Sequence, residues 1–452
     1  MTRLRLFLLV APIATSFVLW ACGDSTNGNT TDPADGGPSG EGGPTTPIDG
    51  GEGDGGASLC SFTLHVDTAF GQKQLPTRGT VFFQGTPQGV LRGLWGASSS
   101  GAIERFRSDG TIDPTFDATA FFAREGAVID RPVYHALRDG SVLVGWDEDK
   151  SPRVAKLRTD GRLDTTFGEG GILALPLVRE AGTDNGFAVA RFAENPDGSI
   201  TIVGYVTVSF QDMPADVYLA RASAAGKLDT TFGQNGSMSI TLPYFNQAWA
   251  ALPLADRKTV LAIYSSDRVI GAPSTYFSSL FRVDGNGAVD RTFGNPEAGV
   301  VLDKDYDDER CQLAPQGESR WIVSGIGASI RRLDLEGRVD PTFGVLGSIP
   351  QYVSETDAAA ASNLGIDTLV TPAGTIVTTR RIVDARPSAP AGHKIQTYDR
   401  DGKVCGPLVP LPYDVDGTYG FKLALAPDGS IFVHWSATQQ QEYREEIVRV
   451  VP

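Results

Sequence analysis

The chain has 452 residues, with 39 basic and 54 acidic side chains and a formal net charge of −15. A nucleic-acid-binding protein presents a basic face, and docking to an anionic bilayer by charge alone needs basic clusters, so the acidity argues against both. The 53 Gly and 28 Pro predict many turns and therefore many short strands. Four Cys and four His leave little material for a zinc or haem site, and we expect no cofactor.

The first 21 residues have the features of a bacterial leader. Arg3 and Arg5 precede an uncharged apolar run that is shorter than the roughly 20 residues of a spanning helix. The run ends in LWAC at residues 19–22, which resembles the lipobox of bacterial lipoproteins. The resemblance implies a lipoprotein signal peptide over residues 1–21 and lipidation of Cys22. An ordinary secretory signal or a short membrane helix with a chance Cys is the alternative.

Residues 23–59 have the composition of a tether. They include 12 Gly, four Pro and seven acidic residues but no Lys or Arg, and only Ile48 and Leu59 are large and apolar. Such a segment cannot form a core, and as a flexible coil it spans about 30–35 Å. With lipidated Cys22 at its start, residues 22–59 would hold a folded domain near the outer membrane, on its periplasmic or surface side.

From residue 60 onward one pattern recurs along the chain. The form DGxLDxTFG is nearly intact in five copies, which begin at residues 109, 160, 225, 286 and 336. A truncated copy, VDTAFG, begins at residue 66, and a degenerate copy, DGKVCG, begins at residue 401. The marker positions run from Asp67 to Cys405, which gives a mean period of about 56 residues. Seven turns interleave with this motif and are here called the Pro-x-Gly turns, after the clearest copies at residues 196–200 and 427–431; three of the weaker copies lack the Pro. Periods of this size are typical of propellers and solenoids.

These motifs resemble the delta-60 repeat, a bacterial repeat family that is functionally uncharacterised and expected to form a β-propeller. The resemblance covers residues 62–452. Each unit has room for four strands, which is one propeller blade. We therefore predict an all-β fold over residues 60–452: a single seven-bladed β-propeller of four-stranded blades, with six or eight blades as alternatives.

The two ends of the repeat region are complementary. The chain ends in EIVRVVP, a strand that lacks its following loop, and the domain begins with LHVDTAFG, a loop that lacks most of its strand. Joining the two completes the seventh unit and closes the ring between N- and C-terminal strands, which removes exposed sheet edges.

Charged residues recur at fixed positions in the motif. The second Asp of each copy is expected to accept backbone N–H bonds from its turn, and a basic residue eight positions earlier is placed to bridge to it. Repetition in every blade favours a structural turn clamp over a ring of functional charges. The predicted clamp residues are Asp113, Asp164, Asp229, Asp290, Asp340, Arg105, Lys156, Arg221, Arg282 and Arg332.

Metal binding has only weak support in the sequence. Two motif copies, Asp284-x-Asn286 to Asp290 and Asp334-x-Glu336 to Asp340, have oxygen spacing similar to calcium loops. The other copies lack the first carboxylate, and calcium takes six to eight oxygen ligands. The acidic run over residues 303–309 is better explained as a solvated loop, and the histidines have no metal spacing. We expect no metal.

The candidate binding face is predicted where the repeat is interrupted. With alternating strand directions, both repeated motifs lie on one face, and the connections between strands one and two and between three and four lie on the other. Long connections occupy residues 206–215, 265–275, 383–392 and 436–443, and such insertions tend to line a binding face. A protein or glycan ligand would contact the nearby aromatic residues, unless these cap strands: Trp146, Tyr205, Phe210, Tyr276 and Trp435.

The remaining cysteines allow one disulfide in an oxidising compartment. With Cys22 lipidated, Cys60, Cys311 and Cys405 are left. We predict a Cys60–Cys405 bridge because both flank motif loops of blades that ring closure makes neighbours.

The function favoured by the sequence is a non-enzymatic, monomeric binding module displayed on the cell envelope. No GxSxG elbow or phosphate-binding loop is present in the sequence. The alternatives are a propeller hydrolase or lyase with a site assembled from several blades, and a purely structural envelope component. An enzyme would gather polar side chains of shifted pKa at its centre and break the repeat there.

Overall fold

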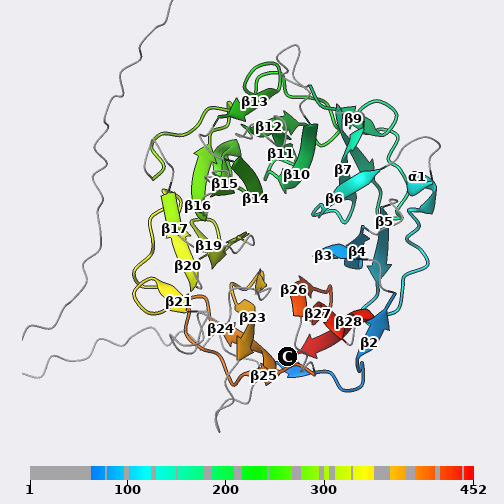
Figure 1. The fold of residues 1–452 in the computed structure, drawn as a ribbon, viewed down its shortest axis with the longest axis vertical. Helices are drawn as coiled ribbons and strands as arrows, with labels where there is room; N and C mark the ends of the chain where they lie inside the picture. Colours follow the sequence, from blue (N-terminus) through cyan, green and yellow to red (C-terminus); the bar gives the residue numbers. More distant parts are fainter. Residues whose placement is uncertain are drawn as a thin grey trace, which may run out of the picture. The chain divides into compact units, whose positions relative to one another are not determined.

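A computed structural model describes residues 63–76, 79–95, 101–123, 129–148, 151–176, 186–207, 216–241, 245–266, 276–294, 300–304, 311–326, 329–350, 367–382, 392–412, 418–439 and 442–452. All of these lie in the compact unit that spans residues 56–452. Its strands form seven antiparallel sheets around a ring, as Figure 1 shows. The unit is therefore a seven-bladed β-propeller, which confirms the fold predicted from the repeat.

Each blade runs from an inner strand beside the central axis to an outer strand at the rim. Blade one contains β3 (Thr80–Thr86), β4 (Gly89–Leu94) and β5 (Ala102–Phe106). Blade two contains β6 (Asp130–Ala136), β7 (Val142–Glu148), β8 (Ser151–Leu157) and β9 (Ile172–Ala174). Blade three contains β10 (Gly186–Glu194), β11 (Ile200–Thr207), β12 (Asp216–Ala222) and β13 (Ser237–Ile240). Blade four contains β14 (Phe245–Pro253), β15 (Thr259–Ser266), β16 (Tyr276–Val283) and β17 (Val300–Lys304). Blade five contains β18 (Gln312–Pro315), β19 (Arg320–Ile326), β20 (Ser329–Asp334) and β21 (Ser348–Pro350). Blade six contains β22 (Thr368–Val370), β23 (Ile376–Ile382), β24 (Gly392–Tyr398) and β25 (Val409–Pro410). Blade seven contains β26 (Thr418–Leu425), β27 (Ile431–Gln439) and β28 (Glu442–Val451), with β1 (His65–Val66) and β2 (Lys73–Leu75) from the start of the domain.

Blade one departs from the four-stranded plan in its described residues. Its sheet contains β3, β4 and β5, and the short helix α1 (Thr119–Phe122) follows the motif where an outer strand follows in blade two. The sequence here is TFDATAFFA, without the Gly-x-x-Gly turn that leads into β9. Phe121 of α1 is buried and packs edge-on against Trp146, with ring centroids 5.9 Å apart.

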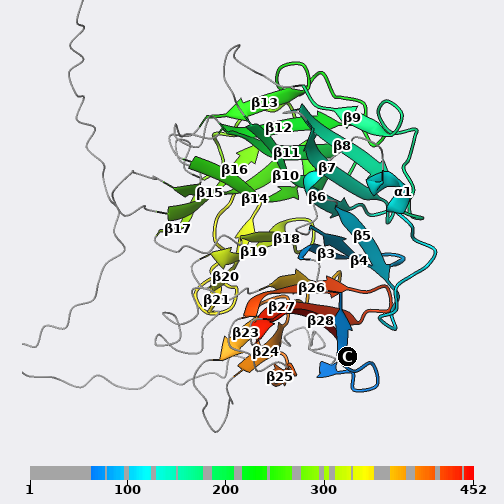
Figure 2. The ribbon, with the colours of Figure 1, turned by 45° about the vertical axis from the view of Figure 1, so that its right-hand side comes forward.

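The ring closes between the two ends of the domain, as predicted. Strand β28 pairs with β27 on one side and with β1 and β2 on the other, in the registers His65↔Val451 and Lys73↔Ile447. Figures 1 and 2 show β2 beside β28. The edges that an open ring would expose are therefore paired at this junction.

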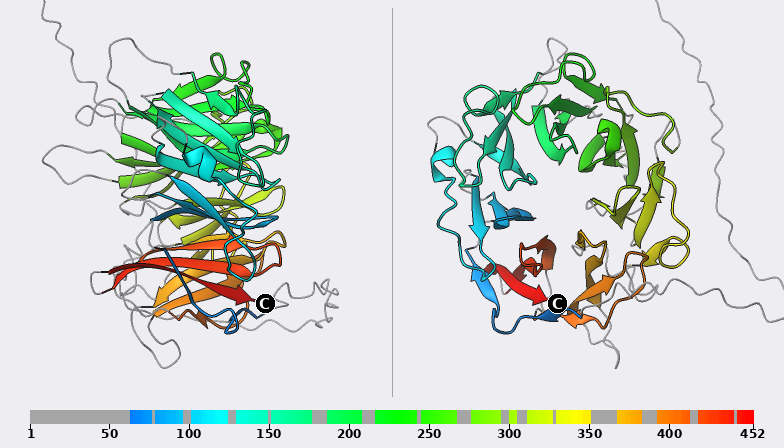
Figure 3. Two further views of the ribbon diagram at one scale, coloured as in Figure 1. Left: turned by 90° about the vertical axis from the view of Figure 1, so that its right-hand side faces the viewer. Right: turned by 180° about the vertical axis from the view of Figure 1, so that it is seen from behind.

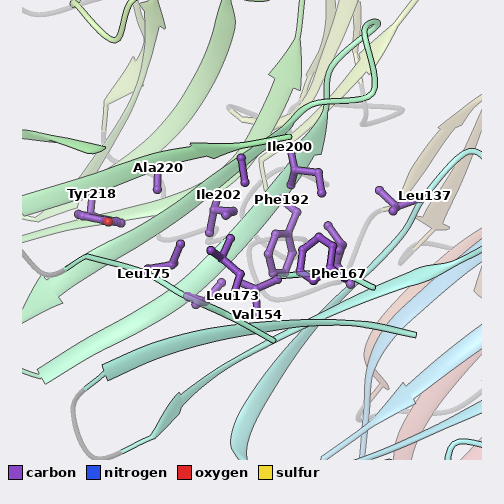
Figure 4. Close-up of a cluster of buried hydrophobic side chains, with 13 residues drawn as sticks. Leu137, Val154, Phe167, Leu173, Leu175, Phe192, Ile200, Ile202, Tyr218 and Ala220 are labelled. Atoms are coloured by element: carbon purple, nitrogen blue, oxygen red, sulfur yellow. The ribbon is translucent and has the colours of Figure 1, made fainter. Parts of the chain in front are cut away.

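The hydrophobic core lies between neighbouring blades. Figure 4 shows the cluster between blades two and three, where Val154, Phe167 and Leu173 face Phe192 and Ile202. A fully buried Phe or Leu side chain contributes about 1.5–3 kcal/mol. One face of each sheet is covered by the next blade, so the contacts between blades stabilise the ring as a whole.

The two ends of the strands define two faces of the propeller. The Pro-x-Gly turns join first and second strands and the DGxLDxTFG loops join third and fourth strands, and all lie on one face, here called the motif face. This is the face on which β28 ends (Figure 3, left). The opposite face, the loop face, carries the connections between second and third strands. The four long connections belong to this class, so their expected place in the blade was wrong: the inner strand precedes the Pro-x-Gly turn, which is itself the first connection.

Candidate functional site

The clamp of blade one shows how the repeated charges are used. The Arg105 Nε donates to Asp113 Oδ2 at 2.8 Å, and the backbone N–H and hydroxyl of Thr115 donate to Asp113 Oδ1 at 3.0 and 2.8 Å. Arg282 and Asp290 repeat the Nε contact at 2.8 Å, and Arg332 and Asp340 repeat it at 3.0 Å.

The same arginines also join each blade to the next. Arg105 Nη1 donates to the Thr159 carbonyl of blade two at 2.6 Å, and Arg332 Nη1 donates to the Arg400 carbonyl of blade six at 2.6 Å. The Arg282 guanidinium likewise donates to the Leu335 carbonyl. Each acceptor precedes a motif Gly by two residues. The guanidinium carbon of Arg332 also lies 4.9 Å from the ring centroid of Phe343, within cation–π range.

The contact between neighbouring blades also explains why the motif contains glycine. Gly402 adopts φ +80°, and a Cβ at this position would lie 2.9 Å from the Gly344 nitrogen of the preceding blade. The Gly344 N–H in turn donates to the Asp401 carbonyl at 2.9 Å. The motif therefore encodes a close approach of two backbones between blades.

Two predicted clamps are arranged differently. The Lys156 ammonium lies 3.7 Å from Asp139 of its own Pro-x-Gly-type turn. In blade three, Arg221 donates to the carbonyls of Gly285 and Arg257 at 2.6 and 2.7 Å, and it is the Arg257 guanidinium that binds the Asp229 carboxylate. Arg257 ends the short 3-10 helix η1 (Ala255–Arg257) with φ +59°, an irregular turn of the next blade that the sequence does not reveal.

The closing blades hold a sixth clamp and a replacement. Arg449 Nε donates to Asp67 Oδ2 at 2.9 Å across the junction, and its Nη1 donates to the Ser108 carbonyl of blade one at 2.7 Å. In blade six, Thr397 and Cys405 occupy the two clamp positions, and the Thr397 hydroxyl donates to the Cys405 carbonyl. The spacing of eight residues, kept at Thr397 and Cys405, is the signal that identifies this pair in the sequence.

Cys405 is disulfide-bonded, whereas Cys311 is a free, buried thiol. The partner of Cys405 is therefore Cys22 or Cys60, and both lie outside the described residues. The Cys60–Cys405 bridge stays a prediction. The lipidation of Cys22 concerns residues outside the described ranges as well.

The clamp carboxylates are held in the charged form. At Asp340 the hydrogen bond from the Thr342 hydroxyl outweighs partial burial and, with the Arg332 charge, lowers the pKa to about 2. Burial opposes the charged form of Asp113, but bonds from Thr115 and Arg105 outweigh it and keep its pKa below the usual range. Carboxylates with this many donors are poor general bases, and their partners are contacts within the fold.

The acidic loops with calcium-like spacing bind their own backbone. Asp284 Oδ1 accepts the N–H groups of Asn286 and Ala288 at 2.9 Å, and Asp334 makes the matching bonds to Glu336 and Arg338. Within the described ranges, no group of three or more His, Cys, Asp or Glu side chains has the arrangement of a metal site. Most of the acidic run at residues 303–309 lies outside those ranges.

Two of the five aromatic residues predicted to contact a ligand on the loop face are buried. Trp146 and Trp435 are each 3% exposed and belong to the apolar clusters between blades. Tyr205 is partly buried near the end of β11, Tyr276 begins β16, and Phe210 lies outside the described residues. Trp95, at the loop-face end of β4, is 40% exposed, and sequence reasoning missed it.

The inner strands of blades five to seven share a polar network. The carboxylate of Asp367 accepts bonds from the Gln312 side chain of β18 and from the backbone N–H of Leu423 in β26, so it links three inner strands. Burial raises the pKa of Asp367, although these donors oppose the shift. No other described blade repeats this carboxylate at the corresponding position, which Arg191 occupies in blade three.

The junction of blades seven and one buries a second set of charges. Arg92 of β4 and Glu445 of β28 form an ion pair with both side chains fully buried. The Thr80 N–H and hydroxyl donate to Glu445 at 2.8 and 3.0 Å. His434 Nε2 lies 4.0 Å from this carboxylate, and burial, with the nearby Lys422 and Arg92 charges, holds the pKa of His434 well below its usual value.

A cleft of about 770 Å³ lies at the rim between blades two and three. Glu148, Arg153 and Glu169 of blade two and Lys227 of blade three line it together with the edge of β9. Arg153 and Glu148 pair with each other at 3.3 Å, so the charges of the cleft are partly neutralised within it.

No helix among the described ranges has the length and apolar character needed to cross a bilayer.

The fold and its repeats define a seven-bladed β-propeller. A family model described as "Domain of unknown function (DUF5122) beta-propeller" matches residues 196–232, from the Pro-x-Gly turn of blade three through its motif loop. The match and the seven blades support a place among uncharacterised β-propellers. No curated protein matches the chain.

Several solved propellers are similar in fold. A prolyl endopeptidase is 13% identical, with 83% of this chain and 46% of that chain covered and a TM-score of 0.40. The Penicillium chrysogenum α-L-arabinanase complexed with arabinobiose is 11% identical (83% and 98% covered, TM-score 0.38), and a mutant Trypanosoma rangeli sialidase displaying trans-sialidase activity is 9% identical (85% and 59% covered, TM-score 0.37). The chain thus spans about half the length of the first and under two thirds of the last. Similarity at this level says nothing of activity.

Proposed function

We propose that this protein is a lipid-anchored β-propeller of the cell envelope whose loop face binds a protein or glycan ligand. The lipobox-like LWAC at residues 19–22 supports the anchor. The loop face supports the binding role, because the four long connections join second and third strands and so belong to it.

The observation that carries the proposal is the contrast between the two faces. On the motif face, the repeated charges of five arginine clamps are used in contacts within and between blades. A face whose side chains are engaged in this way is constrained by packing. The four long connections of the loop face share no such repeat in their sequences, and sequence variation in loops is typical of ligand-binding surfaces.

A ligand screen with paired variants tests this proposal. Thermal unfolding of the full chain would be followed with envelope glycans, peptides and divalent ions. Trp95→Ala removes a 40% exposed side chain from the loop face, and Ile112→Ala removes a 52% exposed side chain from the motif face as a matched control. We expect a ligand-induced rise in Tm that Trp95→Ala reduces and Ile112→Ala leaves unchanged. The reverse pattern would contradict a loop-face site.

A second candidate is a propeller hydrolase or lyase. One observation favours it: Asp367 and His434, both buried and with shifted pKa, lie in adjacent blades where the repeat is broken. Product release from an envelope glycan or peptide, lost in Asp367→Asn with the fold retained, would favour the enzyme. Stabilisation by a ligand that is recovered unchanged would favour the binding module.

A further inference from the structure

The motif face has one strongly exposed apolar strip, made of Val339, Val345, Leu346 and Val404. Leu346 is 91% exposed, Val345 69%, Val404 61% and Val339 42%. The loop that contains Val404 lies against the loop that contains Val345, because the Gly344 N–H donates to the Asp401 carbonyl at 2.9 Å. The strip therefore runs across the junction of blades five and six, beside β21 and β25 (Figure 1).

The turn at the tip of this strip combines exposed apolar side chains with an unfavourable backbone conformation, which is costly for a domain surrounded by water. Leu346 has φ +52°, a backbone conformation that suits Gly or Asn. The equivalent turns of blades two and three place Gly170 (φ +60°) and Asn235 (φ +53°) at this position. Blade three has the polar pair Gln234-Asn235 where blade five has Val345-Leu346. An exposed apolar pair on a strained turn indicates that something covers it.

The chain reaches the propeller next to this strip. The described residues begin at Thr63, which lies beside Gly406, two residues after Val404. Strand β1 follows directly and contacts β25 of blade six. The described part of the chain therefore begins on the motif face, at the end of the strip.

We propose that the strip Val339-Val345-Leu346-Val404 rests in the interface of the bilayer that holds the lipid anchor, so that the loop face points away from the membrane. This inference rests on the proposed anchoring. A tether of about 30–35 Å keeps the motif face close to that bilayer. Two apolar side chains at a loop tip suit insertion among lipids, whereas a stable protein interface buries about 1,200–2,000 Å².

Charge is not the driving force at this surface. Arg338, Arg400 and Lys403 are exposed on the two loops, but Glu336 and Asp401 are exposed beside them. We therefore expect the contact to be as strong on neutral phosphatidylcholine as on vesicles with anionic lipid, and to depend little on salt.

Hydrogen exchange on the lipidated full chain in phosphatidylcholine vesicles tests the proposal. The amides of residues 345–347 are compared with those of the equivalent turn, residues 234–236, in the same molecule. We expect exchange at 345–347 to be slower by about tenfold relative to that reference. Flotation of the chain with the vesicles reports the anchor separately.

A matched variant is available within the chain. Val345→Gln/Leu346→Asn installs the Gln-Asn pair that blade three already folds with the same turn. Protection of the unchanged amides 401–404 is expected to be lost in this variant. Adding Gln234→Val/Asn235→Leu to it, at a distant blade, is not expected to restore the protection.

Each outcome decides the proposal. A chain that floats but exchanges equally fast at both turns overturns the strip and leaves the anchor intact. A chain that does not float overturns the anchoring and the strip together. Protection that weakens when protein is diluted in the vesicle membrane assigns the strip to a second copy of the chain, and this too overturns the bilayer contact.

Discussion

Neighbouring blades are held together by different contacts at two junctions of the ring. Between blades four and five, Arg282 lies at the motif face, pairs with Asp290 of its own blade and donates to the Leu335 carbonyl of the next. Between blades seven and one, the clamp of Arg449 is kept, but a fully buried ion pair of Arg92 and Glu445 is added nearer the loop face.

The difference follows from chain continuity. The strands of blades four and five follow one another in the chain, so these blades need only local contacts to stay in register. In blade seven the break lies inside the sheet: β28 comes from the end of the chain, and it is held to β1 and β2, which lead into blade one, by pairing that covers two and three residues. A buried ion pair adds little net stability, but its loss is costly. Because Arg92 belongs to blade one and Glu445 to β28, we expect the pair to fix the register of β28 beside blade one.

The largest effect is expected from breaking the buried pair at the closure. Glu445→Ala leaves Arg92 buried without its main partner and removes the acceptor of the Thr80 N–H. We expect the free energy of unfolding to fall by about 3–5 kcal/mol, measured by urea denaturation. Glu104→Gln, which removes the second and partly exposed partner of Arg92 at 3.3 Å, is the control and is expected to cost about 1 kcal/mol. Equal losses in the two variants would show that the closure has no special role for Glu445.

A smaller effect is expected at a regular junction. Arg282→Met removes the bonds to Asp290 and to the Leu335 carbonyl and leaves the Asp290 carboxylate with Lys258 at 3.5 Å. We expect a loss of about 2–3 kcal/mol. Lys156→Met is the matched control, because the Lys156 ammonium lies 3.7 Å from an exposed carboxylate, and it is expected to cost under about 1 kcal/mol. Similar costs at both positions would refute the role of the guanidinium in joining blades.

These junctions also show what the sequence predicts and what it does not. The repeat predicts the propeller, because the motif recurs seven times with a mean period of about 56 residues, and the complementary ends predict that the ring closes. It does not predict that Arg257 binds Asp229, because this partner comes from an irregular turn of the next blade. Nor does the sequence decide between contact with a ligand and packing within the fold for Trp146 and Trp435, which are buried, since strand sequence alone does not say which blade covers a side chain.

The closure is also expected to be the acid-sensitive junction. The pKa of His434 is lowered in the fold, whereas an unfolded His titrates near 6.5. Below that pH the unfolded chain binds a proton that the folded chain excludes, so stability falls with pH by up to about 1.4 kcal/mol per unit. The clamp carboxylates have lowered pKa values, so their contribution is complete above pH 4 and is lost only below it.

Urea denaturation at pH 7.5 and 5.5 measures this slope. His434→Gln is expected to lessen it, while His65→Gln, at an exposed position, is expected to leave it unchanged. Part of the slope will remain, because desolvation lowers the pKa of His135 to about 4. If His434→Gln does not change the slope, the closing junction is no more sensitive to acid than the others.

The smallest expected effect is a gain at the irregular junction of blades two and three. In five clamps the arginine donates to a carbonyl two residues before a motif Gly of the next blade. The corresponding acceptor for blade two is the Ala224 carbonyl, which precedes Gly226 by two residues. Lys156→Arg places a guanidinium at the position from which the other clamp arginines reach this carbonyl. The substitution is expected to raise the free energy of unfolding by about 0.5–1.5 kcal/mol. Lys227→Arg, on an exposed part of the same loop, should change nothing. A gain confined to Lys156→Arg would show that an arginine at the clamp position stabilises the ring through the bonds made in the other clamps, to the motif carboxylate and to the carbonyl of the next blade. A gain of equal size in Lys227→Arg would contradict this.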